Sequence, residues 1–304
     1  MKTRNILEKN LTENNFELLK ILLKDRTTNK YIKWATDNYN IYGTSYAPEE
    51  EMQPKNIIIR NTNLIQPRVL KTQEDQSKRT KDKAEVFTPS WICNEQNNLV
   101  DEAWFNRKNV FNTSIENGWI TNSTFIDFPS QKTWKDYIDE RRLEISCGEA
   151  PYLVSRYDTV SGKLIEVPDR IGLLDRKLRV INENVDDEET WIEWVNRAYQ
   201  SIYGYEYQGD NLLIARENMF YTFIDNMEYK FNHIPTLSQM KKIATIISWN
   251  IWQMDGLTMT VPYSVVEQIS WFALKTQKKE AIYCKIFDWR LNCSLEFRLL
   301  MNGG

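Results

Sequence analysis

The sequence predicts an α/β fold in which helices cover both faces of a mostly parallel sheet. Three candidate strands, residues 141–146, 201–206 and 249–255, alternate with long helical stretches. This alternation is typical of parallel sheets, whose ligands bind beyond the carboxyl ends of the strands. A chain of 304 residues is also long enough to bury a large core without disulfides or metals.

The first part of the chain, residues 1–83, is predicted to be a mainly helical accessory region. Apolar residues recur at helical spacing within residues 5–39 and indicate a helix there. The remainder of this region is polar and irregular, and its apolar run at 57–59 is a candidate strand. A basic run at 78–83 indicates either a solvated surface or a local nucleic-acid-binding groove.

The second region, residues 84–304, is predicted to hold the sheet. It opens on a helix at 91–104, because Thr88-Pro89-Ser90 offers a capping hydroxyl and a proline near the first helical position. The stretch 106–140 is expected to cover the sheet edge. Further helices are predicted at 186–200, which has an acidic first turn, at 210–231, which has an apolar side, and at 237–248.

Composition narrows the classes of function. The net charge of −3 argues against a uniformly basic nucleic-acid-binding coat. A single histidine, His233, and the lack of any C-x-x-C pair argue against a zinc site, so no metal is expected. The sequence has no disulfide pattern, no signal-peptide core and no run of about 18 apolar residues, and it therefore predicts a soluble, cytoplasmic protein that does not bind membranes.

Polar or small residues follow each predicted strand. The turn 146–150 after the first strand is rich in small residues, which let a backbone approach a ligand closely. Glu206 ends the second strand, where a carboxylate can accept hydrogen bonds from ribose hydroxyls. Asp255 ends the third and can accept from an adenine amine, while Gly256 lets the chain turn.

Each of these residues alone also fits a plain surface or turn role, but together they predict a site for a nucleoside-containing cofactor. The absence of G-x-G-x-x-G and G-K-[ST] argues against a dinucleotide or P-loop site.

At these residues the chain resembles the DNA adenine-N6 methyltransferases of restriction–modification systems, in the group called restriction endonuclease subunit M. The resemblance covers about residues 80–260 and implies a Rossmann-like methyltransferase sheet, S-adenosylmethionine as cofactor and double-stranded DNA as partner. The residues that it assigns to the cofactor are Phe87, Thr88 and Pro89 in a leading F-x-T-P-type motif, Glu144, Ser146, Cys147, Gly148, Ala150 and Tyr152 in the cofactor loop "LEISCGEAPYL", Glu206 with Tyr207, and Asp255 with Gly256.

The chain departs from the family pattern in three places. Ala150 replaces the second loop glycine, which is tolerable only if the backbone there does not need a positive φ. Glu206 follows Gly148 by 58 residues, against roughly twenty in a compact dinucleotide fold, so an insertion with a hairpin at 152–167 is expected. The family's [DNS]-P-P-[YFW] motif is missing. The nearest text is "TVPYS", in which Pro262 and Tyr263 are the candidate catalytic residues.

Three functions follow from this reading. The first is an S-adenosylmethionine-dependent DNA methyltransferase of the adenine-N6 class, in a restriction–modification or phage-defence system. The second is a non-catalytic cofactor- or DNA-binding subunit whose restriction or methyltransferase partner supplies the catalytic motif. The third is a nuclease, since Asp225 and the stretch 228–230 superficially resemble an acidic-plus-lysine metal site, although that stretch is predicted to be helical.

Overall fold

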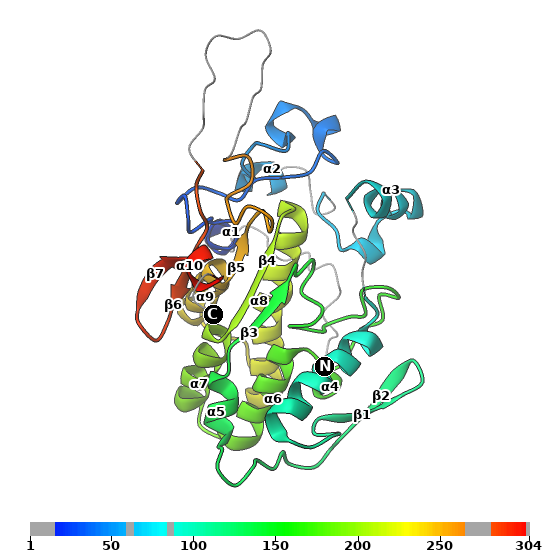
Figure 1. Cartoon of the computed structure of the whole chain (residues 1–304), viewed down its shortest axis with the longest axis vertical. Coiled ribbons are helices and arrows are strands. Elements are labelled where there is room, and N and C mark those ends of the chain that lie inside the picture. Colours follow the sequence, from blue (N-terminus) through cyan, green and yellow to red (C-terminus); the bar gives the residue numbers. More distant parts are fainter. Residues whose placement is uncertain (1–15, 59–63, 84–87, 265–280, 302–304) are drawn as a thin grey trace.

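The computed structural model describes residues 16–58, 64–83, 88–264 and 281–301, which form a mixed α/β structure with small sheets (Figure 1). The α-helices are α1 Phe16–Leu22, α2 Pro54–Ile58, α3 Gln73–Lys83, α4 Ser90–Phe105, α5 Trp134–Asp139, α6 Leu173–Asn184, α7 Glu188–Gln200, α8 Gly209–Phe231, α9 Leu237–Asn250 and α10 Arg298–Met301. The strands are β1 Asn112–Ile115, β2 Gly118–Thr121, β3 Arg142–Ile145, β4 Ile202–Glu206, β5 Ile251–Gln253, β6 Lys285–Asp288 and β7 Cys293–Glu296. Short 3-10 helices lie at η2 Asn40–Tyr42, η3 Thr44–Tyr46, η4 Arg68–Leu70 and η5 Val167–Asp169.

The central sheet consists of β3, β4 and β5, which lie side by side in that order and run parallel. Leu143 pairs with Tyr203, and Tyr205 pairs with Trp252. The three predicted strands and their parallel direction are therefore confirmed. β5 begins later than predicted, because α9 continues to Asn250.

The two faces of this sheet are covered differently. Ile202 and Ile251 point into the main core, where α7, α8 and α9 pack against the strands. Tyr203 and Trp252 point the other way and form a second core cluster with Ile286 of the antiparallel hairpin β6–β7 and with Phe297, which follows it. Within the described ranges, helices α7 to α9 thus cover one face of the sheet. The other face, for which the sequence also predicted helices, is partly covered by the β6–β7 hairpin and the short helix α10 (Figure 1).

The segments that flank the sheet match the sequence predictions in part. The helices predicted at 91–104, 186–200, 210–231 and 237–248 are confirmed as α4, α7, α8 and α9. The insertion between Gly148 and Glu206 holds α6 as well as α7, and its predicted hairpin is reduced to a single antiparallel bridge between Tyr157 and Leu164. Residues 106–140 form β1, β2 and α5, which pack on α4, α6 and α7, and none of these elements pairs with the edge strand β3.

The helix predicted over residues 5–39 is wrong beyond α1, and its residues 5–15 lie outside the described ranges. The chain turns soon after Leu22 because the Asp25 carboxylate accepts hydrogen bonds from the backbone N–H groups of Thr27, at 3.0 Å, and Thr28, at 3.1 Å. Such local side-chain bonds compete with helix continuation. The candidate strand at 57–59 is also wrong for Ile57 and Ile58, which lie in the helix α2 that begins at Pro54, and residue 59 lies outside the described ranges.

The N-terminal region shares its core with the sheet. Leu18 and Leu22 of α1 belong to the main core that also contains Ile202 and Ile251. The buried guanidinium of Arg216 in α8 donates to the backbone carbonyls of Leu22, of Ile251 at 2.8 Å, and of Ser248 at 3.3 Å. Packing and hydrogen bonds therefore cross the predicted boundary between residues 83 and 84, and the division into 1–83 and 84–304 stays a prediction.

A buried ion pair also joins α3 to the first turn of α8. Arg79 is 3% exposed and donates to the fully buried carboxylate of Asp210 at 2.8 Å, and Tyr39 and Lys71 contact the same carboxylate at 2.9 and 3.4 Å. Burial alone would raise the pKa of Asp210. The positive charges of Lys71 and Arg79 outweigh this effect and lower the pKa far below its usual range. The basic run at 78–83 is thus not uniformly solvated, since Arg79 is a core residue.

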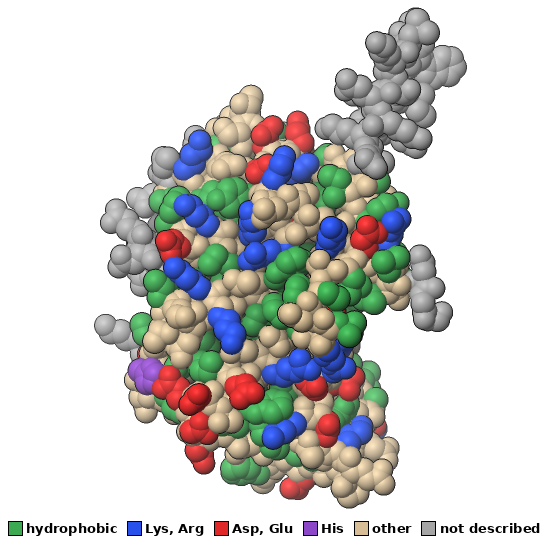
Figure 2. All heavy atoms as spheres, turned by 90° about the vertical axis from the view of Figure 1, so that its left-hand side faces the viewer, with side chains coloured by type: hydrophobic (Ala, Val, Ile, Leu, Met, Phe, Trp, Pro, Cys, Tyr) green, Lys and Arg blue, Asp and Glu red, His purple; other side chains and the backbone are tan. Residues whose placement is uncertain are grey.

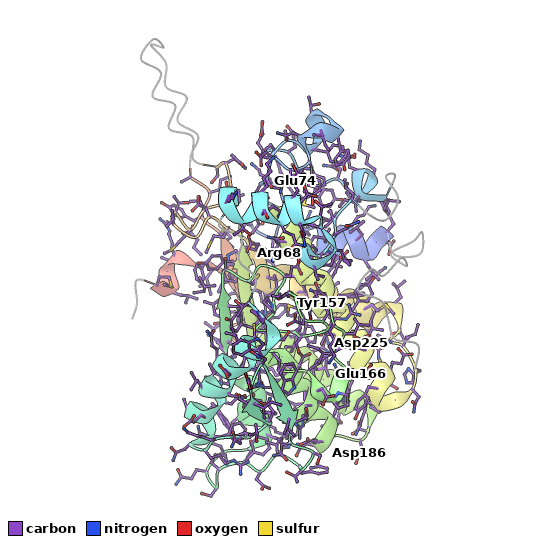
Figure 3. The ribbon with its side chains drawn as sticks, turned by 90° about the vertical axis from the view of Figure 1, so that its right-hand side faces the viewer. Arg68, Glu74, Tyr157, Glu166, Asp186 and Asp225 are labelled. Carbon is purple, nitrogen blue, oxygen red and sulfur yellow. The ribbon has the colours of Figure 1, made fainter. Side chains whose placement is uncertain are left out.

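Asp210→Ala is expected to lower the free energy of unfolding by about 3–5 kcal/mol, because Arg79 would be left buried without its counter-charge. Urea unfolding followed by circular dichroism measures the change. Asp186→Ala is the matched control, since that carboxylate is fully exposed although it pairs with Lys230 (Figure 3). Equal stability of the two variants would show that the Asp210 pair does not hold the N-terminal region on α8.

Candidate functional site

The carboxyl ends of the three parallel strands meet at one rim of the sheet. The Cys147 N–H donates to the Tyr205 carbonyl at 2.8 Å, and the Met254 N–H donates to the Glu206 carbonyl at 3.1 Å. Neighbouring strands are about 4.8 Å apart, so the first and third strand ends are separated by roughly 10 Å. The structure therefore brings the loop after β3, Glu206 and Asp255 to the same rim, with α2 and α3 beyond it (Figure 1).

Glu206 is the residue that connects two of these strand ends. Its Oε2 accepts a hydrogen bond from the Gly148 N–H at 3.0 Å, and its Oε1 accepts one from the Gln208 N–H at 3.1 Å. The side chain is 6% exposed, and burial raises its pKa despite these hydrogen bonds. A third backbone hydrogen bond, from Tyr207, reaches the same carboxylate, so one of its four lone-pair sites is left for a further donor.

The loop after β3 uses two left-handed residues. Gly148 has φ 50° and Ala150 has φ 65°, and the Ala150 N–H donates to the Cys147 carbonyl at 2.6 Å. The alanine that departs from the family pattern therefore stands at a position that does need a positive φ, which costs roughly 1–2 kcal/mol for a residue with a Cβ. Ser146 is exposed at the start of this loop.

The side chain of Cys147 points away from the rim into the main core. It is buried, and a Cβ built on Gly204 of β4 would lie 3.2 Å from the Cys147 Cβ. Burial, together with the nearby carboxylates, raises the pKa of its thiol well above the usual value. Only the backbone of Cys147 is placed to contact a ligand at the rim.

Glu144 lies beneath the loop rather than on the rim. It is buried on the helix-covered face of β3, and its Oε1 accepts a hydrogen bond from the Tyr152 N–H at 3.4 Å. Its Oε2 is buried without a hydrogen-bond partner among the described residues. Burial and, to a lesser extent, the charge of Glu206 raise the pKa of Glu144 well above its usual value.

Glu144→Gln is expected to stabilise the protein more at pH 7 than at pH 4. Because the folded-state pKa is raised, the folded chain holds the Glu144 proton more tightly than the unfolded chain, whose carboxyl titrates near pH 4.3. The wild-type free energy of unfolding therefore falls as pH rises from about 4.3 through the raised pKa, and Gln lacks this loss. Urea unfolding of both proteins at several pH values measures the difference, and a difference that does not change with pH would contradict the buried, proton-binding carboxyl.

The leading motif lies beside the loop. Phe87 is outside the described residues. Pro89 precedes the first residue of α4, and the cap of this helix comes from the Asp158 carboxylate, which accepts from the Ser90 N–H at 2.7 Å, rather than from a neighbouring hydroxyl as predicted. Thr88 shares a hydrogen bond with the side chain of Tyr152. The structure thus brings the motif and the far end of the cofactor loop into contact.

Asp255 shapes its own turn at the third strand end. Its Oδ1 accepts hydrogen bonds from the N–H groups of Leu257 at 2.9 Å and Thr258 at 3.1 Å. Gly256 packs so closely on Tyr205 that an added Cβ would lie 3.1 Å from the ring. Asp255 therefore has the turn-forming role that the sequence left open. Both of these hydrogen bonds go to Oδ1, and neither uses Oδ2.

Tyr263 lies close to Tyr207, next to Glu206 in the chain. The two ring centroids are 6.4 Å apart, and the Lys33 Nζ lies 5.5 Å from the centroid of the Tyr263 ring. Burial and the hydrogen bond with Tyr207 raise the pKa of Tyr263. Pro262 is buried, whereas the ring of Tyr263 is partly exposed. The candidate catalytic tyrosine is thus brought to the same rim.

Thr260, the first residue of "TVPYS", is poorly placed to hold an amine. It is buried, and its hydroxyl shares a hydrogen bond of 2.7 Å with the Thr258 hydroxyl. Its backbone forms bridges to Asp255 and Tyr283. The side chain that stands where the family has its amine acceptor is therefore already engaged inside the protein.

Sequence reasoning missed two residues that fasten other segments to the rim. Buried Glu149 accepts from the Arg68 N–H at 2.6 Å and from the Tyr157 hydroxyl at 2.8 Å, which ties η4 to the cofactor loop (Figure 3). Gln253 donates to the carbonyls of Lys33 and Tyr207, both at 2.8 Å. Glu149 lies within the quoted loop, but nothing in the sequence separates its anchoring role from that of a surface turn.

The described residues do not form the acidic-plus-lysine metal site that the nuclease hypothesis requires. The stretch 228–230 lies inside helix α8, and the Asp225 carboxylate is bound by Arg156 at 3.0 Å and Arg170 at 2.7 Å. Among the described residues, no group of three or more His, Cys, Asp or Glu side chains is arranged to hold a metal ion. His233 lies on the surface and contacts Glu188 at 3.1 Å.

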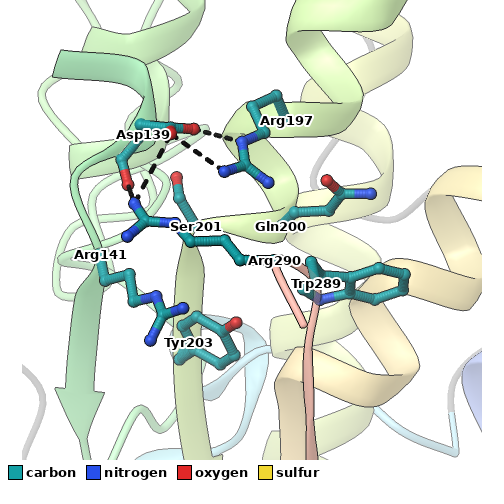
Figure 4. A pocket seen from close by; sticks show the side chains of 8 residues that line it. All are labelled: Asp139, Arg141, Arg197, Gln200, Ser201, Tyr203, Trp289 and Arg290. Carbon is teal, nitrogen blue, oxygen red and sulfur yellow. Dashed lines mark hydrogen bonds and ion pairs between the residues drawn. The ribbon is translucent and has the colours of Figure 1, made fainter. Parts of the chain in front are cut away.

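A second polar cluster occupies the opposite, amino end of the sheet (Figure 4). Arg197 and Arg290 bind the Asp139 carboxylate, and Arg141 binds Asp288 at 3.1 Å. The cavity between them measures about 10 Å³, which is room for one water. This cluster therefore fastens the β6–β7 hairpin to α5 and α7 and leaves no space for a ligand.

Comparisons of this chain with protein-family models, with curated proteins and with solved structures found no match. In the described part of the chain, no helix has the length and apolar character that spanning a membrane demands.

Proposed function

We propose that this chain binds S-adenosylmethionine at the rim of the parallel sheet and is a DNA methyltransferase of the adenine-N6 class, in a restriction–modification or phage-defence system. The observation that carries the proposal is the 3.0 Å hydrogen bond from Gly148 to Glu206, which joins the small-residue loop and the acidic strand end in one site. The sheet would then be the first half of a Rossmann-like methyltransferase fold.

The residues at the rim fit the chemistry of the cofactor. Glu206 keeps one lone pair for a ribose hydroxyl after its three backbone hydrogen bonds, and Asp255 has a carboxylate oxygen that its turn does not use for the adenine amine. Thr88, in the motif that the resemblance assigns to the methionine part of the cofactor, contacts Tyr152 of the cofactor loop. Since Glu206 is 6% exposed, the overlying loop or N-terminal segment must shift for a nucleoside to reach it.

The proposed mechanism asks the protein mainly to position groups. The bound cofactor supplies a methyl group on a sulfonium for transfer to the exocyclic amine of adenine. The protein's own task is to hold that amine in line with the methyl, which supplies much of the rate enhancement in such reactions. Tyr263 is placed to stack on a base that has been flipped out of the duplex.

A second candidate function is a cofactor-binding subunit that depends on a partner for methyl transfer. The observation that favours it is the engaged, buried hydroxyl of Thr260, which occupies the place of the family's amine acceptor. In this case the chain binds the cofactor but transfers no methyl group by itself.

Glu206→Ala and Asp255→Ala are each expected to weaken S-adenosylmethionine binding by about 1–3 kcal/mol, because each removes a hydrogen-bond acceptor from the cofactor. Isothermal titration calorimetry measures the affinities. Glu116→Ala, in the exposed turn between β1 and β2, serves as the control and should bind like the wild type. Unchanged affinity in both rim variants would overturn the site assignment.

Tyr263→Ala is expected to abolish adenine methylation while sparing the affinity for S-adenosylmethionine, because the ring would stack on the base and not on the cofactor. Transfer of a radiolabelled methyl group to DNA of mixed sequence measures the activity. Unaffected turnover would remove "TVPYS" from the site. Cofactor binding without any methylation by the wild-type chain would decide for the second candidate function.

A further inference from the structure

Strand β3 forms an open edge of the parallel sheet. Among the described residues it pairs only with β4, and no element of the segment 106–140 pairs with it. On the face opposite the helices, Leu143 is 41% exposed and Ile145 is 62% exposed. Parallel sheets occur almost only with both faces covered, so this open face is unusual for a finished sheet.

The open face continues into an apolar groove. The hairpin β6–β7 and α10 cover β5 and part of β4 but stop short of β3, which leaves a groove of about 160 Å³. A cavity of about this size accommodates one benzene-sized group. Figure 2 shows hydrophobic side chains on this side of the molecule above a group of Lys and Arg side chains. The groove is lined by Leu143, Tyr203, Trp252, Ile286, Leu295, Phe297 and Leu300, with Arg141, Arg142 and Asp288 at its border.

We propose that the edge and open face of β3 bind a second, different polypeptide that adds a strand parallel to β3. This inference rests on the proposed function. A strand parallel to β3 would end at the same rim, about 4.8 Å from the Ser146–Gly148 loop. Its carboxyl end is where the missing Asp- or Asn-Pro-Pro-aromatic motif would have to stand to hold the target amine beside the cofactor.

The charges at β3 indicate what the partner strand carries. Arg141 stands at the amino end of β3 and keeps its side chain 45% exposed although it pairs with Asp288 at 3.1 Å. An acidic side chain near the start of the added strand would lie beside this positive charge. Apolar side chains further along would cover Leu143 and Ile145.

A second copy of this chain does not fit the same edge. Two copies related by a twofold axis would pair their β3 strands antiparallel, which places the partner's rim at the opposite end of the sheet. The copy would also bring only the engaged Thr260, not a new amine acceptor. A second copy therefore supplies no amine acceptor at this rim, whereas a different chain that carries the motif would.

The direct test is binding of a fluorescein-labelled synthetic peptide, Glu-Val-Ile-Val-Gly-Asn-Pro-Pro-Tyr, followed by fluorescence anisotropy on the full chain. The wild type is expected to bind saturably, and Ile145→Asp is expected to weaken binding by about tenfold or more, since a charge would enter an apolar contact. Ile120→Asp is the matched control, because Ile120 is also 62% exposed but lies on β2, and it should bind like the wild type. No saturable binding, or equal binding by Ile145→Asp, would overturn the proposal.

Two further measurements separate the modes of binding. A peptide N-methylated on the amides that face β3 is expected to lose binding, whereas methylation of the alternate amides should be tolerated. Equal binding of both methylated peptides would rule out strand pairing. A wild-type dimer in light scattering that Ile145→Asp dissociates would assign the edge to a second copy and overturn the proposal.

Titration of the same samples with S-adenosylmethionine keeps the two proposals distinguishable. Cofactor binding without peptide binding would contradict only the proposal that β3 binds a partner strand. Absence of cofactor binding by the wild type would contradict the proposed function itself. Circular dichroism of each variant confirms that the folded chain is being compared.

Discussion

The buried carboxylate of Glu206 holds the candidate site together, because it binds two backbone amides from different parts of the rim. One amide belongs to Gly148 at the end of β3, and the other to Gln208 just before α8. The position of the loop is thereby fixed relative to the strand that carries the acid. The Cys147 N–H, which donates to the Tyr205 carbonyl at 2.8 Å, is a second link between this loop and the central strand.

The N-terminal region forms a wall of this site rather than a separate accessory. Arg68 is bound by Glu149 of the loop, and Lys33 is bound by Gln253 at the end of β5. Arg79 is paired with Asp210 in the first turn of α8. All three contacts join residues before 84 to the rim or to the helix that starts beside it. Any opening that admits a ligand to Glu206 is therefore coupled to this segment.

The sequence predicted the elements whose signal is local. The alternation of short strands with helices along the chain predicted β3, β4 and β5, and apolar residues at helical spacing predicted α8 and α9. The prediction of a long N-terminal helix was wrong, because the turn at Asp25 depends on side-chain hydrogen bonds. The spacing of apolar residues carries no information about such bonds. The covering hairpin was missed, since short strands carry little periodic signal.

Long-range polar partners could not be predicted from one sequence. Arg79 stands in a run of charges that looks solvated, and only its fold neighbour Asp210 makes it a core residue. Glu149 looks like any acidic turn residue until Arg68 and Tyr157 are placed beside it. The cofactor roles of the rim residues stay predictions, because the geometry shows where these side chains lie and not what they bind.

The two sides of the parallel sheet differ: its rim carries the candidate site residues, whereas its β3 edge has no neighbouring strand among the described residues. The cofactor loop, Glu206 and Asp255 lie on consecutive strands, whereas β3 leaves its edge and its apolar face open. Under the proposed function, the rim residues would bind the cofactor, and the open edge favours the second candidate function, a subunit whose partner supplies the amine-holding motif.

Hydrogen–deuterium exchange of the full chain, with and without S-adenosylmethionine, tests the central claim most directly. The account predicts slower amide exchange in three separate segments at once, namely the loop after β3, the Glu206–Gly209 turn and the Asp255 turn. Slower exchange in none of them, or only in segments away from the rim, would contradict a single cofactor site at the ends of these strands.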